Sequence, residues 1–253
     1  MEQHEQNPTK RFSNRVDDYV RYRPGYPPAV TDCLRAETGL DVSSHVADVG
    51  SGTGILSRLL LDTGGHVYGV EPNAAMRAAA ERDMGGHDNF TSVDGCAEAT
   101  TLEDNSIDLV TVAQAFHWFD RDRTHDEFAR ILTPGGYVAL LWNTRLTDAN
   151  TFMRDYEQLL VDHAVDYGSV DHRHTSRGVE SFFSEVTRRA FEFTERLTFA
   201  QSCGRTLSAS YVPAEGHPGH DIIIDALHNA FTASESDGRV DYVYETELYL
   251  GNL

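Results

Sequence analysis

The chain has 253 residues, which suits one large domain or a core domain with an insertion, and 40% of the residues are hydrophobic, as in ordinary globular proteins. The formal net charge of −19 at pH 7 repels a phosphate backbone, so we expect no nucleic-acid partner. Three widely spaced cysteines without a C-x-x-C pair argue against a disulfide framework and a cysteine-based zinc site. Neither a signal peptide nor an apolar run of about 20 residues is apparent, so we expect a cytoplasmic protein without a membrane partner.

From residue 27 to residue 142 the sequence alternates between helical and strand patterns. The first expected helix opens at Pro27-Pro28 and carries Val30, Leu34 and Leu40. We expect strands near 45–49, 67–71, 90–93, 107–113 and 137–142, and helices near 54–63, 73–82 and 121–132, the last ended by Thr133-Pro134-Gly135-Gly136. This alternation predicts a doubly wound parallel sheet, which binds ligands outside the carboxyl ends of its strands.

A glycine-rich turn follows the first of these strands. The run Asp48-Val49-Gly50-Ser51-Gly52-Thr53-Gly54 leads into a helical pattern, which leaves bare backbone for a ligand at a helix N-terminus. Glu71 ends the second strand, where a carboxylate is placed to accept hydrogen bonds from ribose hydroxyls. Together these features predict a nucleoside cofactor. A dinucleotide fingerprint would need a small residue where Ile55 stands, which counts against NAD(P).

Beyond Trp142 the pattern changes. We expect helices at 151–167, 178–187 and 219–233, and alternating strands at 188–199 and 239–250. The aromatic residues of this part favour a packed core over a ligand pocket. They are Phe182, Phe183, Phe191, Phe193 and Phe199.

The glycine turn resembles the first motif of the class I S-adenosylmethionine-dependent methyltransferases. Further segments are similar to the same family in order and spacing: the adenine loop at 93–98, the start of strand four at 105–110, the loop behind it at 114–119, and the turn into strand five at 132–136. The stretches 12–27 and 204–213 resemble the trans-aconitate methyltransferase-like branch, with a type 11 methyltransferase domain.

This resemblance implies a Rossmann-like α/β fold with seven strands, mostly parallel, and an antiparallel end hairpin completed by the two late strands. It divides the chain into a leader at 1–26, a cofactor-binding core at 27–142 and a C-terminal part at 143–253. Helical insertions at 143–187 and 200–238 would cover the substrate within a single structural domain.

The resemblance also implies S-adenosyl-L-methionine as cofactor, with S-adenosyl-L-homocysteine as product. The glycine turn would let backbone approach the methionine part, Glu71 would hold the ribose, and Gln114 would lie on the sulfonium side. Relatives commonly carry an aspartate where this chain has Cys96, so Ala97 is expected to hold adenine through its backbone. The residues assigned to the cofactor are Tyr22, Arg23, Gly50, Ser51, Gly52, Glu71, Pro72, Asn73, Cys96, Ala97, Glu98 and Gln114.

Two of the assignments have structural alternatives. Tyr22 and Arg23 could fold over the pocket as a lid, or the tyrosine could pack the leader while the arginine lies along the surface. His117 is the candidate catalytic residue, a general base for an acceptor hydroxyl. Packing beside Trp118 and Phe119 is the favoured alternative for that histidine.

The branch resemblance implies a small-molecule acceptor methylated on oxygen, with a carboxylate as one candidate group. A carboxylate would need no base. Arg145 could neutralise an anionic acceptor, as could a loop cluster that is otherwise interpreted as exposed, namely His172, Arg173, His174 and Arg177. Two alternatives stay open: an NAD(P)-dependent oxidoreductase, and a catalytically inactive cofactor-binding protein of the same fold. No metal is expected, and the sequence leaves the oligomeric state open.

Overall fold

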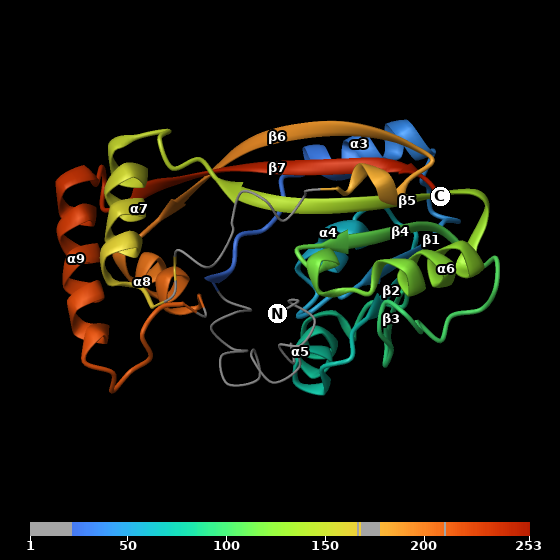
Figure 1. The fold of residues 1–253 in the computed structure, drawn as a ribbon, viewed down its shortest axis with the longest axis horizontal. Helices are drawn as coiled ribbons and strands as arrows, with labels where there is room; N and C mark the ends of the chain where they lie inside the picture. The colour runs from blue at the N-terminus through green and yellow to red at the C-terminus, as the bar shows by residue number, and fades with distance from the viewer. Residues whose placement is uncertain (1–21, 166, 168–177, 210) are drawn as a thin grey trace.

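The computed structural model describes residues 22–165, 167, 178–209 and 211–253 (Figure 1). The cationic loop cluster at 172–177 and the first 21 residues of the expected leader lie outside these ranges. In the described part, no helix combines the length and the apolar character needed to cross a bilayer.

The centre of the molecule is a seven-stranded sheet of order β3-β2-β1-β4-β5-β7-β6. Its strands are β1 (His45–Val49), β2 (His66–Val70), β3 (Phe90–Val93), β4 (Ile107–Ala113), β5 (Leu132–Arg145), β6 (Glu185–Leu197) and β7 (Val240–Asn252). The first five run parallel, and β7 is antiparallel to both β5 and β6. The predicted seven-stranded sheet with an antiparallel end is confirmed.

The described part of the chain forms seven α-helices, which pack on the faces of this sheet or at one end of it. They are α3 (Ala29–Thr38), α4 (Ile55–Leu61), α5 (Ala74–Met84), α6 (Arg121–Ile131), α7 (Thr151–His163), α8 (Phe199–Leu207) and α9 (Gly219–Ser234). Several helices are preceded by a capping residue whose side chain accepts a hydrogen bond from a backbone amide of the first turn, as Asn73 does for α5 and Asp120 for α6. Figure 1 shows α7, α8 and α9 gathered at one end of the sheet, away from α4, α5 and α6.

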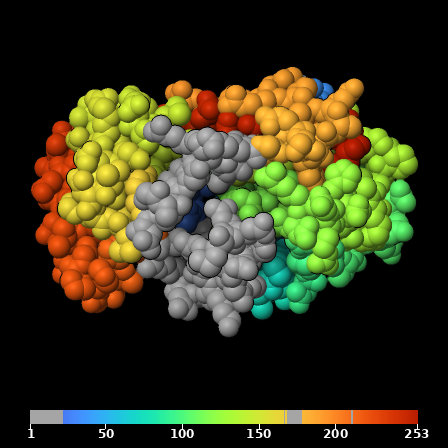
Figure 2. Space-filling view, in the orientation of Figure 1, coloured from blue at the N-terminus to red at the C-terminus, as the bar shows by residue number. Residues whose placement is uncertain are grey.

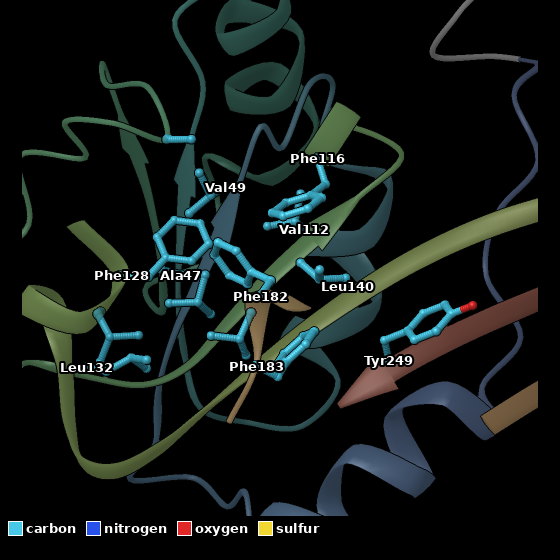
Figure 3. Close-up of a cluster of buried hydrophobic side chains, with 14 of the residues drawn as sticks. Ala47, Val49, Val112, Phe116, Phe128, Leu132, Leu140, Phe182, Phe183 and Tyr249 are labelled. Atoms are coloured by element: carbon cyan, nitrogen blue, oxygen red, sulfur yellow. The ribbon is translucent and has the colours of Figure 1, made fainter. Parts of the chain in front are cut away.

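Three apolar clusters follow from this arrangement. One packs α6 and the segment around Phe182 and Phe183 against one face of the sheet (Figure 3). A second packs α3, α4 and α5 against the opposite face. The third joins α7, α8 and α9 to the far ends of β6 and β7, through residues such as Tyr242 and Leu227. We call this third unit, residues 146–165, 197–209 and 211–244, the lobe.

Two sequence expectations are wrong in detail, and one helix was given no range. The helix expected at 178–187 is only a 3-10 turn, Glu180–Phe182, because β6 begins at Glu185 and pairs with β7 over its full length. The turn expected after α6 is the first part of β5, where a register shift in the pairing with β4 accommodates Pro134. Helix α8 lies almost wholly within the helical insertion expected at 200–238 but was given no range of its own, although Thr198 and Gln201 form a capping box at its start.

Candidate cofactor and acceptor site

The glycine turn joins β1 to α4 and holds three glycines at positive φ: Gly50 at 69°, Gly52 at 59° and Gly54 at 85°. A Cβ on Gly50 would lie 2.7 Å from the Cβ of Ala115, and one on Gly54 would collide with Met84. Beside Gly52, by contrast, the nearest atom is the Met76 sulfur at 3.8 Å. Packing therefore requires two of the glycines, whereas the third presents bare backbone to open space that a ligand can fill.

Glu71 lies directly after β2, and its carboxylate is buried, with 7% of the residue exposed. One oxygen accepts a hydrogen bond from the Gly52 amide at 3.0 Å, and the other accepts from the Asn73 amide at 2.8 Å. Burial raises the pKa of this carboxyl above its ordinary value. The two bonds hold the carboxylate against the glycine turn, and each oxygen keeps a lone pair for a ligand hydroxyl.

A second buried carboxylate, Asp48, lies below the turn. It accepts hydrogen bonds from the hydroxyls of Ser57 at 2.6 Å and Thr111 at 3.0 Å, which tie β1 to α4 and β4. Burial raises its pKa to about 6. Among the described residues neither Asp48 nor Glu71 forms an ion pair, and the buried hydroxyl of Thr53 has no partner there. The negative potential of these two buried carboxylates suits a cationic, polar ligand such as a sulfonium with an ammonium group.

Sequence reasoning missed an arginine that frames the site. Arg77 on α5 donates to the backbone carbonyl of Glu71 at 2.7 Å and pairs with Asp94, after β3, at 2.9 Å. It therefore links the carboxyl ends of β2 and β3 and holds the turn that carries Glu71. The sequence did offer one indication of this ion pair: Asp94 follows the predicted strand at 90–93, next to the strand that ends before Glu71.

The predicted adenine loop follows β3. Ala97 is buried with 2% of the residue exposed, and Cys96 is half-buried beside it, bridged to Ala99 through backbone hydrogen bonds. Burial raises the pKa of the Cys96 thiol, which keeps it neutral. The Glu98 carboxylate accepts from the Asp120 amide at 2.9 Å, so its side chain holds the start of α6.

Two other predicted residues flank the turn after β2. Pro72 is exposed, and Asn73 is buried with its side-chain oxygen accepting from the amides of Ala75 and Met76. The Asn73 side chain therefore caps α5, and its backbone amide supports Glu71.

The loop after β4 packs directly on the glycine turn. Gln114 has the left-handed φ of 58°, and its side-chain amide donates to the carbonyl of Asn143 at 3.2 Å. His117 is largely buried beside Trp118, with ring centroids 4.8 Å apart, and its Nδ1 is buried without a partner in the described structure. Burial lowers the pKa of His117 to about 4, so the imidazole is neutral at pH 7.

Tyr22 and Arg23 lie against α8. The carbonyl of Tyr22 accepts a hydrogen bond from Arg205, and its ring occupies the space beside Gly204 where a Cβ would stand. Arg23 donates to the carbonyl of Ser208 at 3.4 Å. Figure 2 shows dark blue atoms from the start of the described chain between the yellow and orange atoms of the lobe and the green atoms of the cofactor-binding part.

A polar cluster joins the end of β5 to the lobe. Arg145, the last residue of β5, donates to the hydroxyls of Tyr211 at 3.1 Å and Tyr167 at 2.6 Å and to the Glu157 carboxylate at 3.3 Å. Its guanidinium lies 5.5 Å from the ring centroid of Tyr156. The Nε donor of Arg145 is buried and has no partner among the described residues. The cluster thus offers a fixed cation, phenol hydroxyls and one unused donor. In the described ranges, no group of three or more His, Cys, Asp or Glu side chains could hold a metal ion.

Comparison with known proteins agrees with this geometry. Residues 47–140 match the family described as "Methyltransferase domain". An uncharacterised methyltransferase of Mycobacterium tuberculosis is 41% identical over 138 residues, which cover 53% of this chain and 52% of the relative, so the match spans about half the length of that protein. An uncharacterised methyltransferase of Geobacillus kaustophilus is 31% identical over 159 residues, or 58% of this chain and 71% of the relative.

The whole fold has a counterpart among solved structures. A type II methyltransferase from Anaeromyxobacter dehalogenans superimposes with a TM-score of 0.69 at 24% identity, covering 91% of this chain and 98% of the other. That likeness concerns the fold, while the matches above concern the family. The chain belongs to the class I methyltransferases, enzymes whose cofactor is S-adenosylmethionine.

Proposed function

We propose that the protein transfers the methyl group of S-adenosylmethionine to an oxygen of a small-molecule acceptor, and that this oxygen belongs to a carboxylate. The observation that carries the proposal is the contrast between His117 and Arg145. The loop nearest the glycine turn offers a histidine that binds protons poorly, and the end of β5 offers a buried cation.

The cofactor supplies an electrophilic methyl group on a sulfonium when it is bound. Glu71 would accept hydrogen bonds from the ribose hydroxyls, and the bare backbone of Gly52 would lie against the methionine part. Ala97 and Cys96 would enclose the adenine, and Gln114 would face the sulfonium side. The buried charges of Asp48 and Glu71 favour a cationic ligand over an anionic dinucleotide.

The protonation state of the acceptor follows from His117. A general base works best when its pKa lies near the working pH, and burial lowers that of His117 to about 4. Such an imidazole gains little by taking a proton from an alcohol. A carboxylate oxygen already carries its lone pairs unprotonated at pH 7, so transfer to it requires alignment and no base. We therefore assign His117 to packing beside Trp118.

Arg145 supports an anionic acceptor. Its guanidinium stays charged at any working pH and is fixed by Tyr167, Tyr211 and Glu157, which leaves the Nε donor unused. A carboxylate oxygen can accept a charge-assisted hydrogen bond from that one donor.

The test is a transfer assay with methyl-labelled S-adenosylmethionine and a panel of small mono-, di- and tricarboxylic acids. The matched control for each acid is its primary amide, which has the same shape without the charge. A methyl ester releases labelled methanol in mild alkali, so we expect alkali-labile label with acids and none with amides. Alkali-stable label would indicate an ether or amine product and would contradict the carboxylate. Binding of S-adenosylhomocysteine without any transfer would favour an inactive cofactor-binding protein.

A further inference from the structure

Residues 22–26, which we call the strap, run between the lobe and the central sheet. The strap is bound at both ends: the carbonyl of Tyr22 accepts from Arg205, and the amide of Gly25 donates to Glu195 at 3.2 Å. On the sheet side, the side-chain amide of Asn143 donates to the Gly25 carbonyl at 2.8 Å. Three separate elements, α8, β6 and β5, therefore fix one short piece of backbone.

Arg205 is the centre of the lobe side of this arrangement. It is buried, with 10% of its side chain exposed, and each of its nitrogens has a different acceptor: Tyr22, the Tyr244 hydroxyl at 2.6 Å and the Glu195 carboxylate. Glu195 in turn uses its other oxygen for the Gly25 amide. Only the planar fork of arginine reaches all three acceptors at once, because a lysine carries its donors on one nitrogen.

The neighbouring glycine has a matching role. A Cβ on Gly204 would overlap three atoms of the Tyr22 ring, so α8 accepts the strap only with glycine at this position. Glycine inside a helix is unfavourable by itself, and its presence in α8 therefore has a packing cause. Gly204 and Arg205 together bind the strap to α8.

On the sheet side, hydrogen bonds and packing connect the strap to the cofactor site. Besides holding Gly25, Asn143 accepts from the Thr246 hydroxyl at 2.6 Å, and its carbonyl accepts from the Gln114 side chain. Gln114 directly follows β4 in a left-handed conformation, and the next residue, Ala115, lies against Gly50 of the glycine turn. A continuous chain of contacts thus connects the strap to the turn.

We propose that Arg205 and Asn143 are positioning residues for methyl transfer: they hold the strap between the lobe and the loop at 114–119, where it would form one wall of the acceptor site, and so fix that wall relative to the cofactor. This inference rests on the proposed function for its effect on turnover. The cofactor contacts at Gly52 and Glu71 lie in the turns after β1 and β2 and are bonded to each other, whereas Arg205 and Asn143 bond the strap itself. We therefore expect both residues to act on acceptor alignment, with at most a small effect on cofactor affinity.

The first readout is amide hydrogen exchange of the full-length protein without ligand, compared between wild type, Arg205→Lys and Asn143→Ala. We expect faster exchange in peptides that contain Gly25 and, in the same variants, in peptides that cover 114–119. The first matched control is Arg196→Lys, since Arg196 of β6 also bridges a carboxylate, that of Asp241, and a backbone carbonyl, that of Ser236. The second is Asn252→Ala, since Asn252 bonds the Gly136 carbonyl at the opposite end of the sheet. Neither control should change exchange at 22–26 or 114–119.

The second readout separates the acceptor from the cofactor. We expect Arg205→Lys and Asn143→Ala to lower kcat about 10- to 100-fold, the range for a misaligned reacting group, while the affinity for S-adenosylhomocysteine by calorimetry stays within about twofold. Because the two variants act from opposite sides of the strap, misfolding of one leaves the other informative.

Faster exchange confined to the strap, with 114–119 unchanged, would overturn the coupling. An equal loss of activity in Arg196→Lys would mean that Arg205 only stabilises the fold, and it would contradict the positioning role. If wild type methylates no acid, the proposed function fails, but the exchange experiment still decides whether the strap and the loop are linked.

Discussion

The cofactor end of the sheet and the lobe are built in different ways. At the cofactor end, short runs of sequence define the site, because backbone amides and glycines at positive φ shape it. Gly50 is packed under Ala115, and Gly52 faces open space. Where β5 meets the lobe, the polar cluster comes from side chains far apart in the chain, such as Arg145, Tyr211 and Glu157. The first kind of site has a sequence signature, and the second has none.

The family match reflects the same division. It covers residues 47–140 and ends before Asn143 and Arg145. The part of the chain that identifies the cofactor is therefore separate from the part that would select the acceptor. Changes at the two places should separate cofactor affinity from acceptor use.

The largest effect is expected for Gly52→Ala. The protein has room for the new methyl group, but that room is where the ligand would lie, so we expect the affinity for S-adenosylhomocysteine to fall by about 100-fold or more. Residue 52 has φ 59°, which costs about 1–2 kcal/mol of stability for alanine. Gly135→Ala is the matched control, since Gly135 also has a positive φ and open surroundings. Similar affinities for the two variants in calorimetry would contradict the role of Gly52.

Glu71→Ala comes next. It removes the acceptor for the amides of Gly52 and Asn73 and for the ribose, and the unpaired groups should cost about 1–3 kcal/mol of cofactor binding. Calorimetry with S-adenosylhomocysteine measures this directly, and Glu81→Ala on α5 serves as a control outside the site. An unchanged dissociation constant would refute the ribose role.

Arg145→Lys tests the polar cluster that joins β5 to the lobe. Lysine keeps the charge but cannot serve Tyr167, Tyr211 and Glu157 in the geometry of the guanidinium, so we expect the acceptor KM to rise about tenfold. The affinity for S-adenosylhomocysteine should not change. Arg154→Lys, on an exposed arginine of α7, is the control. Weakened cofactor binding in Arg145→Lys would break the separation between the two regions.

The smallest effect is expected for His117→Ala, because this residue packs and takes no proton. Turnover should stay within about threefold of wild type, and cofactor affinity should be unchanged. In wild type the neutral form of His117 persists down to its pKa of about 4, so between pH 6 and 8 turnover should follow the same pH profile in wild type and in His117→Ala. A loss of turnover near pH 6.5 that His117→Ala removes, or a collapse of turnover in that variant, would identify the histidine as a base after all.

How far the sequence could predict the molecule follows from the same comparison. Glycine spacing and strand order predicted the sheet and placed Gly52 beside Glu71, because these depend on local backbone geometry. The pattern at 178–187 predicted a helix, but the long pairing of β6 with β7 decides where that segment becomes a strand, and pairing partners lie too far apart to be seen in one window. The roles of Arg77 and Arg205 depend on side chains that meet only in the folded chain.

The central claim is that the glycine turn and Glu71 hold S-adenosylmethionine. Calorimetric titration of the wild-type protein with S-adenosylhomocysteine, and separately with NADH, tests it most directly. We predict binding of S-adenosylhomocysteine at about micromolar concentration, near −8 kcal/mol, and no heat with NADH. Folded protein that binds NADH and ignores S-adenosylhomocysteine would contradict the account of the site.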